Sequence, residues 1–259
     1  MNSFFGEDVL LSGTASKEIY SSIKDLPIID YHCHLDQAAI QADKKFTDIG
    51  ELWLAGDHYK WRAMRMCGVD EYFITGEASY HEKFLHYAEI LPQLCGNPLY
   101  YWTHFELKQV FGINKTLNKE SAEEIYAEAN EKLKTLSVQK LLKLFHVQFV
   151  VTTSDPTEDL KDHGKVNETD VTPTFRPDKL YNFDSKYIEE LGKVVGYSLN
   201  DLDSFQKALG ERLDFFKSKG CRITDHGFRS FPKSYATYEE AKALYLKRDS
   251  LSASEKDSL

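Results

Sequence analysis

The residues with the clearest chemical potential are two histidines separated by one position. His32 and His34 follow an apolar run, residues 26–30, that predicts a β-strand. Side chains alternate along a strand, so the two imidazoles point to one face and Cys33 points to the other. Two imidazoles on one face can bind one divalent metal. A polar loop whose histidines bind no metal is the alternative, and the pair alone leaves it open.

Polar side chains also follow the later strands that the sequence predicts. Those strands are residues 147–153, 171–175 and 221–224. Asp155, Arg176, Asp225 and His226 come directly after them. The carboxyl ends of parallel strands form one face of a TIM-type barrel, or the switch point of a doubly wound sheet. No glycine-rich phosphate loop follows the first strand, so we favour the barrel.

Between the first two predicted strands, residues 36–139 are typical of helices. Ser121 and Glu124 have the spacing of a capping box, and Ser137 also stands where it can cap a helix. Helices are predicted over 125–136, 138–145, 204–219 and 238–247, and after Ser252. A helix that leads into a fully apolar strand indicates a parallel, buried sheet.

The bulk composition excludes several classes of protein. The 259 residues carry a net charge of −9, which disfavours nucleic acid and anionic membranes as partners. The four cysteines are scattered without a C-x-x-C, as in reduced thiols. No run of 18 apolar residues and no leader pattern is present, so we expect a cytoplasmic protein. A small-molecule substrate is the expected partner, and a homo-oligomer stays open.

Five ordered blocks of the sequence resemble the uronate isomerases (glucuronate isomerases) of the amidohydrolase superfamily. The blocks are DHYKWRAMR (57–65), YWTHFEL (101–107), TTSDP (152–156), TFRPD (174–178) and TDHG (224–227). The resemblance implies an α/β fold, a (β/α)₈ TIM-type barrel of the metal-dependent hydrolase superfamily. It implies a helical insertion after the first strand. We assign residues 1–36 and 140–259 to a partial barrel and 37–139 to the insertion.

The resemblance also implies an activity and residues that perform it. The activity is aldose–ketose isomerisation of D-glucuronate to D-fructuronate, and of D-galacturonate to D-tagaturonate, in hexuronate catabolism. His32 and His34 match the family's metal-binding pair, with Zn²⁺ expected first and Mn²⁺ second. His58 and Tyr59 match a pair that reaches into the site from the insertion, and Arg176 matches a substrate-binding arginine.

The chemistry of isomerisation supports these assignments independently. A divalent cation polarises a carbonyl and stabilises a developing oxyanion. A planar guanidinium is the best clamp for the uronate carboxylate, and we expect Arg176 first and Arg62 second in that role. His58 or Tyr59 can hydrogen-bond the sugar or move protons.

Other readings of the same residues stay open. Asp225 and His226 suit a ligand or a base, but Asp-His-Gly also suits a turn. Arg176 could form a surface ion pair with Asp178, and Trp61 could belong to the core of the insertion. The remaining histidines, among them His104, are taken as structural or exposed.

One feature of the family has no match in this sequence. Its members are nearly twice as long, and their final metal ligand is an aspartate in an Asp-x-Arg arrangement at the eighth strand. We therefore expect the N-terminal portion of an apparently truncated uronate isomerase, inactive alone unless a second fragment completes the barrel. A metal-dependent amidohydrolase and a non-catalytic fragment are the alternatives.

Overall fold

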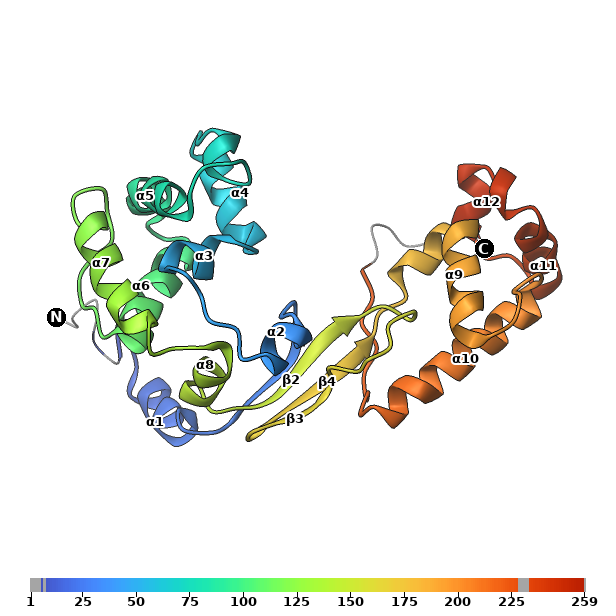
Figure 1. Cartoon of the computed structure of the whole chain (residues 1–259), viewed down its shortest axis with the longest axis horizontal. Coiled ribbons are helices and arrows are strands. Elements are labelled where there is room, and N and C mark those ends of the chain that lie inside the picture. The colour runs from blue at the N-terminus through green and yellow to red at the C-terminus, as the bar shows by residue number, and fades with distance from the viewer. Residues whose placement is uncertain (1–5, 7, 228–232, 259) are drawn as a thin grey trace. The chain divides into compact units, whose positions relative to one another are not determined.

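The computed structural model describes residues 6, 8–227 and 233–258 (Figure 1). The chain forms two compact units. One comprises Met1–Pro27 and Ala42–His146, and the other comprises Ile28–Gln41 and Val147–Leu259. Among the described residues, no helix combines the length and the apolar character that crossing a bilayer requires.

The first unit is helical, as the sequence predicts for residues 36–139. Its elements are α1 (Thr14–Ile23), α3 (Ile49–Leu54), α4 (His58–Met66), η1 (Glu71–Phe73), α5 (Tyr80–Ile90), η2 (Leu91–Leu94), α6 (Pro98–Phe111), α7 (Ala122–Leu133) and α8 (Val138–Leu144). One apolar core, which includes Trp53, Phe84 and Leu107, holds α3, α5 and α6 together. Helix α8 starts as predicted, because the Ser137 side chain accepts the Lys140 amide.

The predicted capping box before α7 is wrong. Ser121 makes no side-chain bond to the first turn of the helix. Its hydroxyl donates to the carbonyl of Thr116 at 2.8 Å and accepts the Asn118 amide at 3.0 Å. The Ser121 hydroxyl is therefore used in a turn that precedes the helix, and it is not available to cap the first turn of α7.

Gly50 marks a close approach within the helical unit, between α3 and the start of α5. A Cβ at this position would lie 2.2 Å from the backbone oxygen of Tyr80. We expect Gly50→Ala to lower the free energy of unfolding by about 2 kcal/mol, because the overlap outweighs the better helix propensity of alanine.

All three tryptophans, Trp53, Trp61 and Trp102, belong to this unit, so urea unfolding followed by tryptophan fluorescence measures its stability alone. Gly56→Ala is the matched control, since nothing lies within 4 Å of a Cβ there. Equal stabilities of the two variants would contradict the close approach.

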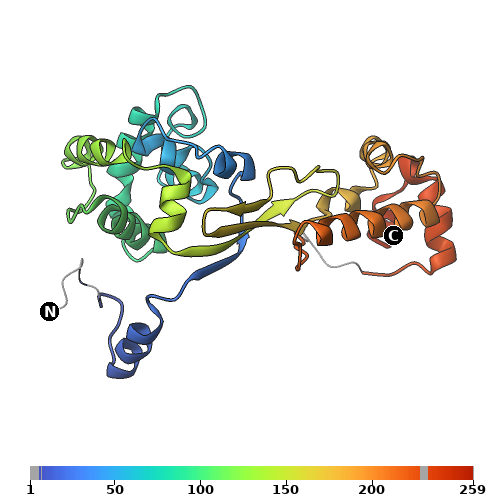
Figure 2. The same cartoon turned by 60° about the horizontal axis from the view of Figure 1, so that its bottom comes forward.

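The second unit is built on a four-stranded sheet. Its elements are β1 (Ile28–Cys33), α2 (Gln37–Gln41), β2 (Val147–Ser154), β3 (Gly164–Val166), β4 (Thr169–Phe175), η3 (Asp178–Asn182), α9 (Ser185–Val195), α10 (Leu202–Ser218), α11 (Tyr238–Leu246), η4 (Arg248–Ser250) and α12 (Ala253–Ser258). The strand order is β1-β2-β4-β3. Figure 2 gives a second view of the whole chain. β1, β2 and β4 are parallel, which confirms three predicted strands.

The fourth predicted strand, residues 221–224, is wrong as a strand. Within the described residues, only Thr224 forms a parallel bridge, to Phe175 at the end of β4. The reason is a hairpin that the sequence did not predict. β3 pairs antiparallel with β4 from Thr169 to Val171 and occupies that part of its outer edge. Only the last residues of β4 remain for residues 221–224.

Strand β1 contains an irregularity between Asp30 and Cys33, the interval that includes His32. Asp30 pairs with Val150, and Cys33 pairs with Thr152, so three steps along β1 match two along β2. The extra residue is a β-bulge, which bends a strand and re-aims its side chains.

Helices pack on the sheet and on one another in this unit. Phe175 from β4 meets Phe216 from α10 with ring centroids 5.1 Å apart, and Cys221 and Leu160 complete that cluster. A second cluster joins α9, α10 and α11 around the fully buried Tyr245. These contacts set β4 against α10 and so fix the ends of the strands.

Candidate functional site

The structure brings His32 and His34 together at the end of β1. Their ring centroids are 5.0 Å apart and their planes are nearly perpendicular, at 89°. Thr153, at the end of β2, places its Oγ1 3.4 Å from Nδ1 of His34. Both imidazoles therefore lie at the carboxyl end of β1, and His34 lies beside the end of the parallel strand β2.

Asp225 orients the ring of His32. Its Oδ2 lies 3.0 Å from Nδ1 of His32. A carboxylate oxygen accepts, so this bond puts the proton on Nδ1 and leaves the lone pair on Nε2. A carboxylate holds a metal-binding histidine in this way, with the other ring nitrogen directed at the metal.

Arg176 joins the same network from the end of β4. Its Nη1 donates to Asp225 Oδ2 at 3.1 Å, and its Nε donates to Asp178 Oδ2 at 2.8 Å. The bond to Asp178 raises the pKa of Arg176 further. Burial raises the pKa of Asp178, but the Gly227 amide and Arg176 outweigh burial and bring it below its usual value. The ion pair between Arg176 and Asp178 is therefore present, and it belongs to a network that also includes Asp225 and His32.

Two contacts in this region lack any signal in the sequence pattern. The hydroxyl of Tyr181 lies 2.5 Å from Nδ1 of His226, and the amide of Gly227 donates to Asp178 Oδ1 at 3.0 Å. Tyr181 and Asp178 both belong to η3, so this short helix holds the segment 225–227 in two places. The partners are 45 and 49 residues apart in sequence.

The loop after β2 is fixed by buried polar contacts. Arg212 of α10 is 8% exposed and donates to the carbonyls of Pro156 and Glu158 at 2.7 and 2.6 Å. Asp155 accepts the hydroxyl of Tyr187 at 2.6 Å. Asp155, a strand-end residue in the sequence pattern, therefore braces the loop through α9.

The predicted residues of the insertion lie at the start of α4, in the helical unit. Asp57 caps this helix by accepting the amides of Tyr59 and Lys60. The rings of His58 and Tyr59 are 4.3 Å apart, and Arg62 lies over Tyr59 at 5.9 Å. All three side chains are exposed.

Trp61 has the role that the alternative reading gave it. It packs against the core of the helical unit, and its Nε1 donates to the carbonyl of Leu54 at 2.7 Å. His104 is also structural, as the sequence analysis takes it to be, since it is fully buried and bonded on both ring nitrogens.

Cys33 is buried, as the alternation along the strand predicts, and burial raises its pKa to about 11. We expect iodoacetamide at pH 8 to alkylate Cys33 about 100-fold more slowly than a thiol at the ordinary pKa of 9.0, because the thiolate is the nucleophile. Peptide mass spectrometry over time measures this, with the exposed Cys95 as the internal reference. Equal rates for the two cysteines would contradict this environment.

The donor types at the end of β1 suit a divalent metal. They are the two imidazoles of His32 and His34, a ligand type that Zn²⁺ and Mn²⁺ both accept. His32 presents Nε2 for this purpose, because Asp225 binds its Nδ1. In the part of the chain that the structure describes, no three His, Cys, Asp or Glu side chains are arranged to hold an ion.

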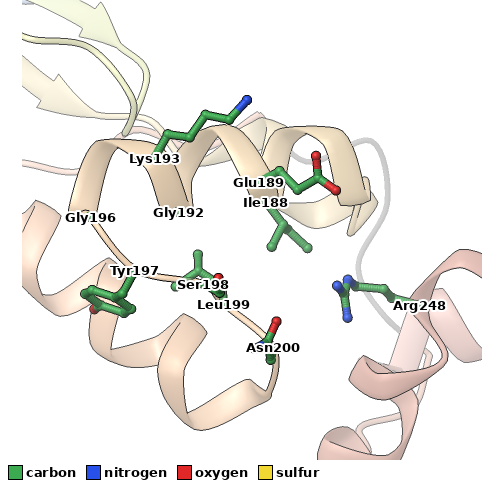
Figure 3. A pocket seen from close by; sticks show the side chains of 10 residues that line it. All are labelled: Ile188, Glu189, Gly192, Lys193, Gly196, Tyr197, Ser198, Leu199, Asn200 and Arg248. Carbon is green, nitrogen blue, oxygen red and sulfur yellow. The ribbon is translucent and has the colours of Figure 1, made fainter.

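A separate pocket of about 640 Å³ lies along α9 and η4 (Figure 3). Arg248 points toward it from η4, and Gly192, Gly196 and Asn200 form part of its wall. None of the described residues that line it belongs to the His32–Arg176 network. The candidate site is therefore at the strand ends and not in this pocket.

The chain matches the family model of glucuronate isomerase over residues 1–258. The uronate isomerase of Caldicellulosiruptor saccharolyticus is 42% identical over 257 residues, which cover 95% of this chain and 55% of that protein. The crystal structure of uronate isomerase from Thermotoga maritima superposes with a TM-score of 0.94 at 38% identity, over 99% of this chain and 59% of that one. Glucuronate isomerase from Caulobacter crescentus, at 24% identity and a TM-score of 0.89, shares the fold.

These comparisons confirm the fold that the sequence implies. The parallel strands β1, β2 and β4 are part of a TIM-type barrel, into which a helical segment is inserted after β1. The chain spans about 55% of the length of the curated relatives it matches. With a family model matched over nearly its whole length, the chain belongs to the glucuronate isomerase family.

Proposed function

We propose that this chain carries the metal-binding and carboxylate-binding part of a uronate isomerase. The substrates are D-glucuronate and D-galacturonate, and the products are D-fructuronate and D-tagaturonate. The observation that carries the proposal is the network at the strand ends, where Asp225 connects the histidine pair to Arg176. Family membership supports it.

His32 and His34 would hold the divalent metal, Zn²⁺ first and Mn²⁺ second. When bound, the metal supplies Lewis-acid polarisation of the sugar carbonyl and its neighbouring hydroxyl. Asp225 keeps His32 in the tautomer that exposes Nε2. Arg176 binds the carboxylate of the sugar acid, because its guanidinium matches two carboxylate oxygens.

Isomerisation moves one proton from C2 to C1 through an enediolate. We assign this transfer to Asp225 and His226, which stand next to each other beside Arg176. The Tyr181 hydroxyl on Nδ1 of His226 fixes the orientation of that ring. His58 and Tyr59 are assigned to hydrogen bonds with the sugar, with Arg62 as a second cation for the carboxylate. This assignment treats residues 37–139 as an insertion into a barrel formed by residues 1–36 and 140–259.

Replacing Arg176 tests the proposal most directly. We expect Arg176→Met to weaken D-glucuronate binding about 10- to 100-fold, because a charge-assisted pair to the carboxylate is lost. Calorimetric titration of the Zn²⁺-loaded chain measures the affinity. Arg222→Met is the matched control, since Arg222 donates to the carbonyls of Lys217 and Cys221 and lies outside the network.

Two other outcomes would redirect the assignment. Unchanged D-glucuronate affinity in Arg176→Met would overturn the role of Arg176. Hydrolysis of amides or lactones without uronate binding would favour the amidohydrolase alternative. Ketose formation from D-glucuronate, measured with and without added Zn²⁺ or Mn²⁺, tests the proposed isomerase activity itself.

A further inference from the structure

Asp178 connects two segments that border the guanidinium of Arg176. Its Oδ2 accepts from Arg176 Nε at 2.8 Å, and its Oδ1 accepts from the Gly227 amide at 3.0 Å. Each carboxylate oxygen therefore has its own donor. The orientation of the carboxylate, and with it the plane of the guanidinium, is set from both sides.

The bonds of Arg176 leave one end of its guanidinium available. A guanidinium has five N–H donors, one on Nε and two on each Nη. Among the described residues, Asp178 takes the Nε donor and Asp225 takes one donor on Nη1. Three donors remain, one on Nη1 and two on Nη2. They lie at the end of the group, where a planar carboxylate binds two nitrogens at once.

Gly227 keeps this end uncovered. A Cβ at Gly227 would lie 2.7 Å from Asp178 Oδ2 and 2.8 Å from Arg176 Nη2. Such contacts are too short for a real Cβ, so any side chain here would displace Asp178 or Arg176. The glycine allows its backbone to approach and to donate to Asp178 without blocking Nη2.

The ion pair between Arg176 and Asp178 contributes little to the stability of the fold. The side chains of Arg176 and Asp178 are 27% and 29% exposed. Ion pairs with that access to water contribute little to stability, because solvent screens them. The main effect of this ion pair is to set which N–H donors of the Arg176 guanidinium face a ligand.

We propose that Asp178 and Gly227 are positioning residues that hold the end of the Arg176 guanidinium toward the substrate carboxylate and thereby select sugar acids over neutral sugars. The inference rests on the proposed function, in which Arg176 binds that carboxylate. Asp178 acts through Arg176 and does not itself touch the substrate.

The test measures how strongly the chain prefers a charged sugar acid to its neutral amide. D-glucuronate and the neutral D-glucuronamide are titrated into the full chain, and the ratio of their affinities is the readout. We expect Asp178→Asn and Gly227→Ala each to lower this ratio about tenfold, the equivalent of one misplaced charge-assisted bond. An asparagine has one acceptor atom and cannot serve both Arg176 and the Gly227 amide.

Two matched substitutions control for general damage. Asp184 also accepts backbone amides, at the start of α9, so Asp184→Asn removes a comparable structural bond. Gly210 lies within α10 with nothing within 4 Å of a Cβ, so Gly210→Ala changes only the residue type. Both controls are expected to leave the affinity ratio unchanged.

A second measurement reports the geometry without any ligand. The Nε–H signal of Arg176 in ¹⁵N NMR, identified by its loss in Arg176→Met, is expected to exchange slowly with water. Asp178→Asn should speed this exchange about tenfold, because the acceptor is displaced. Unchanged exchange in Asp178→Asn would overturn the inference, whatever the wild-type affinities are.

The titrations distinguish the positioning role of Asp178 and Gly227 from the carboxylate-binding role of Arg176. If Arg176→Met abolishes the preference for the anion while Asp178→Asn and Gly227→Ala keep it, the positioning role fails and the proposed function stands. If Arg176→Met keeps the preference, the role of Arg176 in the proposed function fails as well.

Discussion

Replacing His32 and His34 together by alanine is expected to weaken Zn²⁺ binding at least about 100-fold, because each imidazole supplies a coordinate bond that water replaces poorly. Competition with a chromophoric chelator measures the Zn²⁺ affinity. Asp225→Asn should weaken binding about tenfold, since the amide no longer fixes the tautomer of His32.

The matched control for the double replacement is His81→Ala with His86→Ala. These two histidines lie on α5 in the helical unit, where His81 pairs with Glu123 at the surface and the His86 ring packs at a tilt against Phe73. The control removes the same number of imidazoles and should leave Zn²⁺ affinity unchanged. Equal Zn²⁺ affinity of the wild type and the His32/His34 variant would support the non-catalytic alternative.

The histidine pair could be predicted from sequence because its geometry is local. An apolar run sets the strand, and alternation along the strand puts both imidazoles on one face. The same local reasoning placed Cys33 in the core. The bulge between Asp30 and Cys33 was not predictable, because it depends on how β1 pairs with β2, whose residues lie more than 100 positions later.

The partners of Arg176 show where local reasoning stops. Asp178 is two residues away in sequence, so an ion pair could be anticipated. The bond from Arg176 to Asp225 and the bond from the Gly227 amide to Asp178 each span 49 residues, and they arise only when the end of β4 lies beside residues 224–227. Tyr181 is a further case, since no motif marks it as a partner of His226.

Strand pairing also explains why the predicted strand at residues 221–224 does not form. Residues 221–224 have the composition of a strand, but pairing requires a free edge. β3 takes the first part of the outer edge of β4, and only Thr224 reaches the remainder. The β3–β4 hairpin turns at Asn167, which has a positive φ of 53°, a conformation that asparagine tolerates and that composition alone does not reveal.

His104→Leu is expected to lower the free energy of unfolding of the helical unit by about 3 kcal/mol, because it leaves a buried amide without an acceptor. His104 is fully buried in α6. Its Nε2 accepts the amide of Leu117 at 2.9 Å, so the ring proton is on Nδ1, 2.6 Å from the carbonyl of Tyr100. Tryptophan fluorescence during urea unfolding measures the loss in this unit. His81→Leu, which removes a surface imidazole, should cost less than about 1 kcal/mol.

The same histidine makes the stability of the helical unit depend on pH. Burial lowers the pKa of His104 below its ordinary value of 6.5, so the folded state favours the neutral ring. As the pH falls below 6.5, the unfolded chain takes up a proton that the folded chain refuses, and the free energy of unfolding declines. The decline ends once the pH passes below the folded pKa. In His104→Leu this contribution is absent, so the difference in stability between wild type and variant should shrink as the pH falls through that window. A constant difference from pH 7 downward would show that His104 titrates alike in both states and that its burial carries no electrostatic cost.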